Sequence, residues 1–174
     1  MNNEAEVRIR ARISTGELER RWKEVRQAMK ESKLDFLVLY NCTDILGGYV
    51  RWFTDMPAIL NYPAMVIFPL DNEMITIWHG PRLPAEPGPP DWALRGVKKR
   101  ISYPYLPSLS YTTTFDAEKV TEELVQYKDC RIGLVGMGSI TAAFYKYVTE
   151  HLGAASFTDA TELVDNIKVI KSDE

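Results

Sequence analysis

Apolar residues along this chain alternate between helical spacing and short continuous runs. The first helical pattern follows Ser14-Thr15-Gly16-Glu17, which is typical of a helix N-terminus with a capping box. Its apolar positions recur at spacings of three and four residues and are Leu18, Trp22, Val25 and Met29. We expect an amphipathic helix that ends near Ser32.

Short apolar runs predict strands, and the first of them, which is continuous, predicts a strand that is covered on both faces. Residues 35–40 form the first run, directly after the helix. Residues 64–68 and 74–78 form two more, and Asp71-Asn72 lies between them. Because Asp and Asn tolerate turn conformations, these two strands are expected to form an antiparallel hairpin. A short helical segment is expected between the first strand and the hairpin, at residues 43–52.

The second half of the chain continues the alternation of strands and helices. Residues 97–101, 131–136 and 155–158 are predicted strands. Asp116 is expected to cap a helix that buries Val120, Leu124 and Tyr127, and Ser139 is expected to open another. The apolar stripe of that second helix comprises Ile140, Ala143, Phe144, Tyr147, Val148 and Leu152. Asp159 and Glu162 are typical of one more helix start.

Strands that alternate with amphipathic helices, with one hairpin among them, predict an α/β fold. We expect a three-layer α/β/α arrangement with a mixed sheet of about six strands, in a single domain over residues 1–174. Residues 1–12 are expected to be a flexible tail. Residues 81–90 contain five prolines in ten positions, which predicts a stiff surface loop inside the domain.

Composition narrows the class of function. The chain has 174 residues, 45% of them hydrophobic and 26% charged, with a formal net charge of −3. This charge disfavours a nucleic-acid partner, which requires a concentrated basic face, and Lys98-Lys99-Arg100 is interpreted as a solvated strand edge. Cys42 and Cys130 lack zinc-ligand spacing, so we expect a reduced, cytoplasmic protein without a metal site in this chain. Neither a signal peptide nor a membrane span is predicted.

Gly136-Met137-Gly138-Ser139-Ile140-Thr141 is the strongest apparent motif. It follows a predicted strand, opens a helix and precedes Asp159 by about twenty residues, which nearly reproduces the dinucleotide-binding fingerprint. Thr141 stands where the fingerprint has its third glycine, and the unit lies near the end of the chain. A tight turn that requires glycine for its backbone angles is the favoured interpretation. A small nucleotide-binding module is the alternative.

Arg51, Trp52 and Phe53 form the one segment that suggests a ligand contact. An arginine flanked by large aromatic residues presents a planar cation beside stacking surfaces, which suits a carboxylate. The alternative is that the aromatic rings belong to the core and Arg51 extends to solvent. His79, His151, Asp44 and Asp55 lack partners at catalytic or metal-ligand spacing and are interpreted as structural, and no catalytic residue is assigned.

The final residues, Ile170-Lys171-Ser172-Asp173-Glu174, predict a helix start. Ser172 suits an N-cap, and the two acidic residues that follow suit the positive end of a helix dipole. We therefore expect residues 170–174 to begin the junction to a further domain.

The order of these elements resembles the N-terminal domain of the creatinase, prolidase and aminopeptidase P family of metallohydrolases. The resemblance covers nearly all of residues 12–174. It is most specific at the closing Ile-Lys-Ser-Asp-Glu, which in the family joins this domain to the catalytic "pita-bread" domain. It implies a ribonuclease-H-like α/β/α layer without catalytic or metal-binding residues. The family's divalent metal, such as Mn²⁺, Zn²⁺, Fe²⁺ or Co²⁺, is bound in the second domain.

The resemblance also implies partners and a role. In the family this domain supports homodimer formation and narrows access to the active site, often that of the neighbouring subunit. Residues 45–54 are the segment that can face the substrate of the partner subunit. The family commonly has Asn-Ile-x-Tyr-Leu-Thr-Gly-Phe there, whereas this chain has Asp44-Ile45-Leu46-Gly47-Gly48-Tyr49-Val50-Arg51-Trp52-Phe53-Thr54. A plain prolidase specificity is therefore in doubt, and a creatinase-like amidinohydrolase or a hydrolase of another small carboxylate fits equally well.

Overall fold

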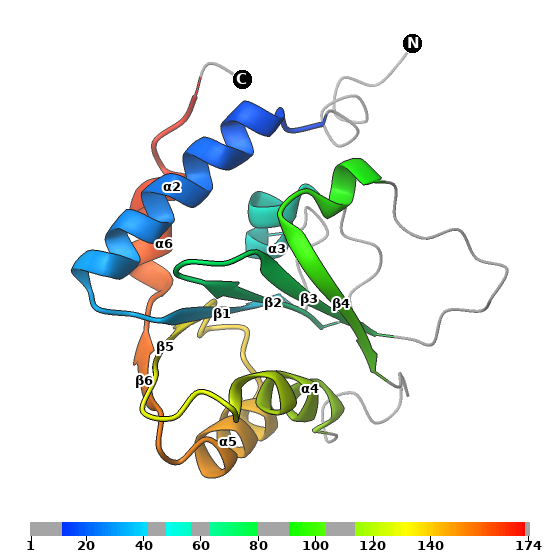
Figure 1. Cartoon of the computed structure of the whole chain (residues 1–174), viewed down its shortest axis with the longest axis vertical. Helices are drawn as coiled ribbons and strands as arrows, with labels where there is room; N and C mark the ends of the chain where they lie inside the picture. The colour runs from blue at the N-terminus through cyan, green and yellow to red at the C-terminus, as the bar shows by residue number, and fades with distance from the viewer. Residues whose placement is uncertain (1–11, 42–47, 57–62, 80–90, 104–113, 173–174) are drawn as a thin grey trace, which may run out of the picture.

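A computed structural model describes residues 12–41, 48–56, 63–79, 91–103 and 114–172 of the chain. Helices and strands alternate along these residues (Figure 1). The helices are α2 (Thr15–Glu31), α3 (Gly48–Thr54), α4 (Phe115–Leu124), α5 (Ala142–His151) and α6 (Thr161–Lys168), with a short 3₁₀ helix, η1 (Asp91–Leu94). The strands are β1 (Phe36–Asn41), β2 (Ala64–Pro69), β3 (Met74–His79), β4 (Val97–Tyr103), β5 (Arg131–Val135) and β6 (Ser156–Asp159).

The six strands form one mixed sheet in the order β4-β3-β2-β1-β5-β6. The predicted hairpin is confirmed, because β2 pairs antiparallel with β3 and also with β1. The remaining pairs, β1 with β5, β5 with β6 and β3 with β4, are parallel. Helices α2, α3 and α6 cover one face of the sheet and α4 and α5 cover the other, so the predicted three-layer α/β/α architecture is confirmed (Figure 1).

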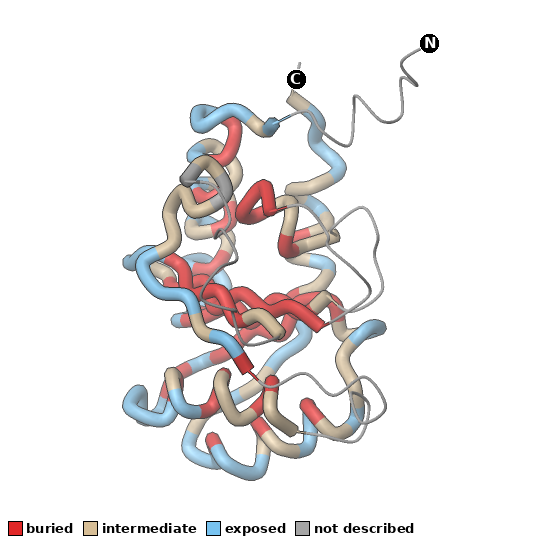
Figure 2. Tube along the Cα trace, turned by 90° about the vertical axis from the view of Figure 1, so that its right-hand side faces the viewer, coloured by how far each residue is buried: buried red, intermediate tan, exposed pale blue. Residues whose placement is uncertain are grey.

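Side chains of the central strands alternate between the two faces, as a pleated strand requires. In β1, Phe36, Val38 and Tyr40 pack toward α4 and α5, whereas Leu37 and Leu39 pack toward the other layer. All five are at most 8% exposed, because helices cover both faces. Full burial of each such side chain contributes about 1.5–3 kcal/mol. Figure 2 shows the buried residues concentrated in the sheet, with exposed residues on the outer sides of the helices.

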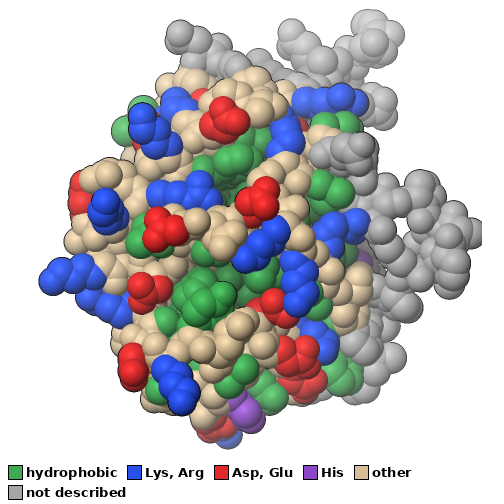
Figure 3. All heavy atoms as spheres, viewed as in Figure 1, with side chains coloured by type: hydrophobic (Ala, Val, Ile, Leu, Met, Phe, Trp, Pro, Cys, Tyr) green, Lys and Arg blue, Asp and Glu red, His purple; other side chains and the backbone are tan. Residues whose placement is uncertain are grey.

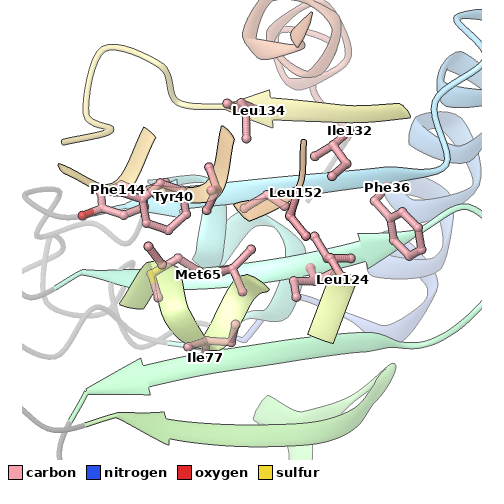
Figure 4. Packing of buried hydrophobic residues seen from close by; sticks show 14 of the residues in the cluster. Phe36, Tyr40, Met65, Ile77, Leu124, Ile132, Leu134, Phe144 and Leu152 are labelled. Atoms are coloured by element: carbon pink, nitrogen blue, oxygen red, sulfur yellow. The ribbon is translucent and has the colours of Figure 1, made fainter. Parts of the chain in front are cut away.

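Figure 4 shows the core beneath α4 and α5. Phe144 of α5 lies against Tyr40 of β1, with ring centroids 4.9 Å apart and an edge-to-face angle of 62°. Leu124 of α4 and Met65 of β2 are buried in the same cluster. The aromatic pair and the aliphatic side chains around it join this helix layer to the sheet.

The first predicted helix is confirmed as α2. The Ser14 hydroxyl accepts a hydrogen bond from the Glu17 amide at 3.1 Å, which satisfies one of the free amides of the first turn. The predicted apolar stripe, Leu18, Trp22, Val25 and Met29, is buried.

Two predicted helix starts are wrong in detail. Thr114, not Asp116, is the N-cap of α4, and Asp116 is buried, where it accepts a hydrogen bond from the Tyr40 hydroxyl at 3.2 Å. Tyr127 lies beyond this helix and is 45% exposed, so it is not part of its buried face. Thr141, not Ser139, caps α5, because the backbone bond from Ser139 to Gly136 O closes a turn before the helix begins.

Several predictions fall partly or wholly outside the described residues. They concern the flexible tail at 1–12, of which only residue 12 is described, the loop at 81–90, and the helical segment at 43–52. Helix α3 accounts for the last part of that segment and continues to Thr54. Of the predicted helix start at 170–174, residues 170–172 are described and follow α6 without a further helix.

Candidate functional site

Helix α3 carries the segment that the sequence singled out, and α2 holds its C-terminal end. The Trp22 indole donates to the Phe53 carbonyl at 2.8 Å, and the Arg21 guanidinium donates to the Trp52 carbonyl at 3.1 Å. The Asp55 amide donates to the Arg51 carbonyl at 2.7 Å. Carbonyls at the end of a helix have no partner within the helix, and here α2 side chains supply two of the missing donors.

Asp55 ends α3 and anchors it to two other segments. Its φ of 61° is in the left-handed region, where a helix usually places glycine or asparagine. The buried carboxylate accepts from Arg95 at 2.9 Å and from the Ile13 amide at 3.1 Å. Burial raises the pKa of Asp55 above its usual value, although the Ile13 amide and the charges of Arg95, Arg51 and Arg21 oppose the rise.

Trp52 and Arg21 form a stacked pair on the surface between α3 and α2. The Arg21 guanidinium carbon lies 5.0 Å from the centroid of the Trp52 ring, within cation–π range. Arg21 also donates to the carboxylate of Glu17 at 2.7 Å, so its orientation is fixed by two partners. The cation that stacks on Trp52 is therefore Arg21, which sequence reasoning missed because it precedes Trp52 by 31 positions.

The three residues predicted to lie near a ligand occupy different environments. Phe53 is fully buried and packs edge-to-face on Phe68, with ring centroids 5.0 Å apart. Arg51 and Trp52 are half-buried, and Arg51 lies close enough to Asp55 for its charge to lower the pKa of that carboxyl. Contact with a ligand stays a prediction for all three. Because Phe53 is fully buried, any influence on a ligand would be indirect, through its packing against Trp52.

We define the α3 face as Arg51 and Trp52 together with Arg21, Asp55 and Arg95. Three arginines lie beside an indole ring, and two buried carboxylates, Asp55 and the Glu17 that pairs with Arg21, offset two of their charges. Arg95 is engaged in the structure, since it donates to Asp55, to the Trp92 carbonyl at 2.7 Å and to the Thr15 hydroxyl at 3.0 Å. The arrangement suits a planar anion such as a carboxylate, with guanidinium donors and a stacking surface.

The glycine turn between β5 and α5 has a local structural role. Gly136 has a φ of 85°, and a Cβ there would lie 2.7 Å from the Tyr40 carbonyl oxygen. The amides of Gly136 and Met137 donate to the Thr161 hydroxyl at 3.1 and 3.3 Å, and the Thr141 hydroxyl accepts from the Phe144 amide. These amides are therefore engaged within the chain, so no contact of this turn favours the nucleotide-binding alternative, which stays untested.

Neither histidine lies in a catalytic arrangement among the described residues. His151 stacks on Tyr147 with ring centroids 3.8 Å apart, and its Nδ1 lies 2.9 Å from the Tyr147 carbonyl oxygen. His79 stacks on Trp78 at the end of β3, and burial lowers its pKa. Within the described ranges, no three His, Cys, Asp or Glu side chains come together in a group that could hold a metal ion.

Charges of both signs are interspersed on the face of the molecule shown in Figure 3, with hydrophobic surface between them. The residues 98–100 form an exposed part of β4, as predicted for a solvated strand edge. In the part of the chain that the structure describes, no helix is long and apolar enough to cross a membrane.

Comparison with known proteins gives a likeness in structure but not in sequence. No protein-family model and no curated protein matches the chain. A proline dipeptidase from Streptococcus pneumoniae is 16% identical with a TM-score of 0.58, over 86% of this chain and 98% of that one. The N-terminal domain of Xaa-Pro dipeptidase from Lactobacillus brevis is 12% identical with a TM-score of 0.56, over 83% of this chain and 98% of that one.

A longer structure shows the same likeness over part of its length. The prolidase from Thermococcus sibiricus is 9% identical with a TM-score of 0.62, over 89% of this chain but 38% of that one. This chain therefore has the fold of the N-terminal domain of Xaa-Pro dipeptidase, as the resemblance implied, and spans less than two fifths of the prolidase.

Proposed function

We propose that this chain is the non-catalytic N-terminal domain of a metal-dependent hydrolase related to Xaa-Pro dipeptidase, aminopeptidase P or creatinase. In this proposal it contributes to homodimer assembly and narrows access to the active site of a cytoplasmic enzyme. The divalent metal, Mn²⁺, Zn²⁺, Fe²⁺ or Co²⁺, and the catalytic residues belong to a further domain, so the chain alone hydrolyses nothing.

The observation that carries this proposal is the extent of the structural match. The likeness includes 98% of a structure described as an N-terminal domain of Xaa-Pro dipeptidase, but 38% of a prolidase. A unit that corresponds to one part of a longer hydrolase is expected to act together with the remainder. A free, buried Cys130 agrees with a reducing compartment.

We propose that the α3 face is the part of the domain that approaches the substrate. A dipeptide and creatine both carry a carboxylate, and a guanidinium beside an indole ring recognises such a group through charge-assisted hydrogen bonds. Arg51 is the residue proposed to make this contact because it directly precedes Trp52 in α3. Arg21 and Arg95 hold the surface together through Glu17 and Asp55.

The first experiment compares the 174-residue chain with the full-length gene product. Each is supplied with Mn²⁺, Zn²⁺, Fe²⁺ or Co²⁺ and assayed on Xaa-Pro dipeptides and on creatine. We expect hydrolysis by the full-length protein and none by the 174-residue chain. Hydrolysis by the short chain would overturn the proposal, and so would a full-length protein that lacks a hydrolase domain.

The second experiment tests the role of the α3 face in the full-length enzyme. Arg51→Ala is expected to raise KM by roughly 10- to 100-fold, because a hydrogen bond between charged groups contributes roughly 1.5–3 kcal/mol. Arg131→Ala is the matched control, since Arg131 is an exposed arginine at the start of β5 and its variant should leave KM unchanged. Equal KM values for the two variants would show that Arg51 does not contact the substrate.

A further inference from the structure

Tyr49 connects the first turn of α3 to α6. Its hydroxyl lies 2.9 and 3.0 Å from the two carboxylate oxygens of Asp165 and donates to that carboxylate across 116 positions of sequence. The Lys168 ammonium lies 4.1 Å from the centroid of the Tyr49 ring and 3.9 Å from Asp165 Oδ1. These three residues, which we call the Tyr49 clamp, combine a hydrogen bond, a cation–π contact and an ion pair.

The Tyr49 hydroxyl remains a donor at neutral pH. Burial, the hydrogen bond to Asp165 and the charges of Asp165 and Asp159 raise the pKa of Tyr49 to about 12. The groups that face the ring from α6 are the Asp165 carboxylate and the Lys168 ammonium. The contact therefore persists over the physiological range of pH.

Helix α6 is anchored at its start to another element, and its end carries local capping bonds. At its start, the Thr161 hydroxyl accepts from the amides of Gly136 and Met137 in the turn after β5. At its end, the Val169 amide donates to the Asp165 carbonyl at 3.0 Å, and the Lys171 ammonium donates to the Lys168 carbonyl at 3.1 Å. The start of α6 is therefore tied to the turn after β5, and the capping bonds continue its backbone to Lys171.

Helix α3 depends on such contacts because it is short. Seven residues form fewer than two full turns, and a helix of this length is marginal without tertiary contacts. Its C-terminal end is held by the hydrogen bonds from Arg21 and Trp22 of α2. Its N-terminal turn is held by Tyr49, and Arg51 and Trp52 follow two and three positions later. The Tyr49 clamp therefore influences where the α3 face lies relative to α6.

We infer that Tyr49 is a positioning residue for the α3 face: the clamp on Asp165 and Lys168 fixes Arg51 and Trp52 relative to the polypeptide that follows α6. This inference rests on the proposed function, in which that polypeptide leads to the catalytic domain. Figure 1 shows α3 and the described end of the chain on the same side of the sheet, which such a link requires. Tyr49 acts through its neighbours and is not expected to contact the substrate itself.

The test uses the full-length gene product with Tyr49→Phe, which removes only the hydroxyl. We expect KM for the carboxylate substrate to rise about fivefold, with kcat within about twofold, because the variant misplaces a binding surface and not the reacting groups. Asp165→Ala, which removes the acceptor, should raise KM similarly, and the double variant should add little, since both break one interaction. Tyr145→Phe, at an exposed tyrosine of α5, is the matched control and should change neither value.

A second measurement does not depend on activity. Hydrogen exchange of the α3 amides should become faster in Tyr49→Phe, while exchange in α4 stays unchanged. Unchanged α3 exchange would overturn the inference, and so would a normal KM in a Tyr49→Phe enzyme whose Arg51→Ala counterpart has a raised KM. If the full-length protein has no hydrolase activity, the proposed function fails, and the exchange measurement still decides whether the clamp orders α3.

Discussion

The two helix layers bury similar apolar surfaces against the sheet but differ in how they use charge. The α4–α5 layer packs through ring pairs such as Tyr40 with Phe144, and its buried carboxylate, Asp116, accepts from the Tyr40 hydroxyl. Its ion pairs reach the surface, as in Lys146 with Glu150, whose side chains are 75% and 57% exposed. In the α2–α3–α6 layer the carboxylates of Glu17 and Asp55 are paired with arginines and only 5% and 1% exposed.

Cation–π contacts follow the same division. Among the described residues, the stacked cations are Arg12 on Trp92, Arg21 on Trp52, Arg26 on Phe68 and Lys168 on Tyr49. All of them lie on the α2–α3–α6 side of the sheet. Buried charges cost desolvation energy and are rarely the most stabilising choice for a core. The arginine-paired carboxylates and the stacked cations are thus concentrated in the α2–α3–α6 layer, whereas the buried Asp116 of the α4–α5 layer is bonded to a tyrosine hydroxyl.

The largest expected losses of stability come from substitutions in the apolar cores on the two faces of the sheet, and the losses should be similar on both faces. Phe53→Ala in one layer and Phe144→Ala in the other each remove a fully buried ring, so each should cost about 3–5 kcal/mol of unfolding free energy in urea titrations. A loss below about 1 kcal/mol for Phe53→Ala alone would show that its ring is not part of a packed core. The comparison of the two layers would then fail.

The apolar positions of both cores could largely be predicted from the sequence, because buried helices and strands leave a periodic pattern of apolar residues. The runs at β1, β2 and β3 and the stripe of α2 appear in the sequence as local patterns. Helix starts were less certain, because serine, threonine and aspartate near a start have similar capping ability. Asp116 turns inward to Tyr40 instead of capping α4, and this contact spans 76 positions that no local pattern records.

The next largest effect concerns the turn that joins β5 to α5 and contacts both Tyr40 and Tyr49. Gly136→Ala should cost about 2–3 kcal/mol, because its φ is 85° and a Cβ would lie 2.7 Å from a backbone oxygen. Gly138→Ala is the matched control and should be nearly neutral, since a Cβ there meets no atom within 4 Å. Urea titration measures both. A loss of saturable NAD or ATP binding in Gly138→Val would instead revive the nucleotide-binding alternative.

A smaller effect is expected from the buried charge of Glu17. Hydrogen bonding to Arg20, aided by Arg21 and opposed by burial, lowers the pKa of Glu17 from 4.5 to about 2. The stabilisation is therefore complete above pH 4.5 and is lost as the pH falls toward 2. Because Arg20 is partly exposed, we expect Glu17→Gln to cost roughly 1–2 kcal/mol at pH 7.

Urea titrations at pH 7 and pH 3 test whether the stabilisation by Glu17 decreases at low pH. The difference between wild type and Glu17→Gln should shrink at the lower pH. Glu150→Gln, which breaks the exposed pair with Lys146, should change stability by less than about 0.5 kcal/mol at either pH. A constant difference for Glu17→Gln would mean that its carboxylate gains nothing from the arginines, and the contrast in charge between the layers would lose its energetic basis.

The candidate site was only partly predictable, because contacts between residues far apart in the sequence leave no local pattern, as with Asp116 and Tyr40. Sequence reasoning singled out Arg51, Trp52 and Phe53 from their neighbouring aromatic residues. It missed Arg95, which pairs with Asp55 from 40 positions away, because no periodic pattern links the two. It also missed Tyr49 as a link to α6, although an aromatic residue with a polar end in a short helix was a usable signal.

A small effect on stability is expected at Trp52, where the contributions of packing and of ligand recognition can be measured separately. Trp52→Phe keeps an aromatic ring against Phe53, which lies 5.1 Å away, and weakens the stack under Arg21, so it should cost less than about 1 kcal/mol. In the proposed full-length enzyme the same change should still raise KM, because a smaller ring offers less stacking surface beside Arg51. A variant that loses stability without a change in KM would assign Trp52 to packing, and the α2–α3–α6 layer would then differ from the α4–α5 layer in composition but not in purpose.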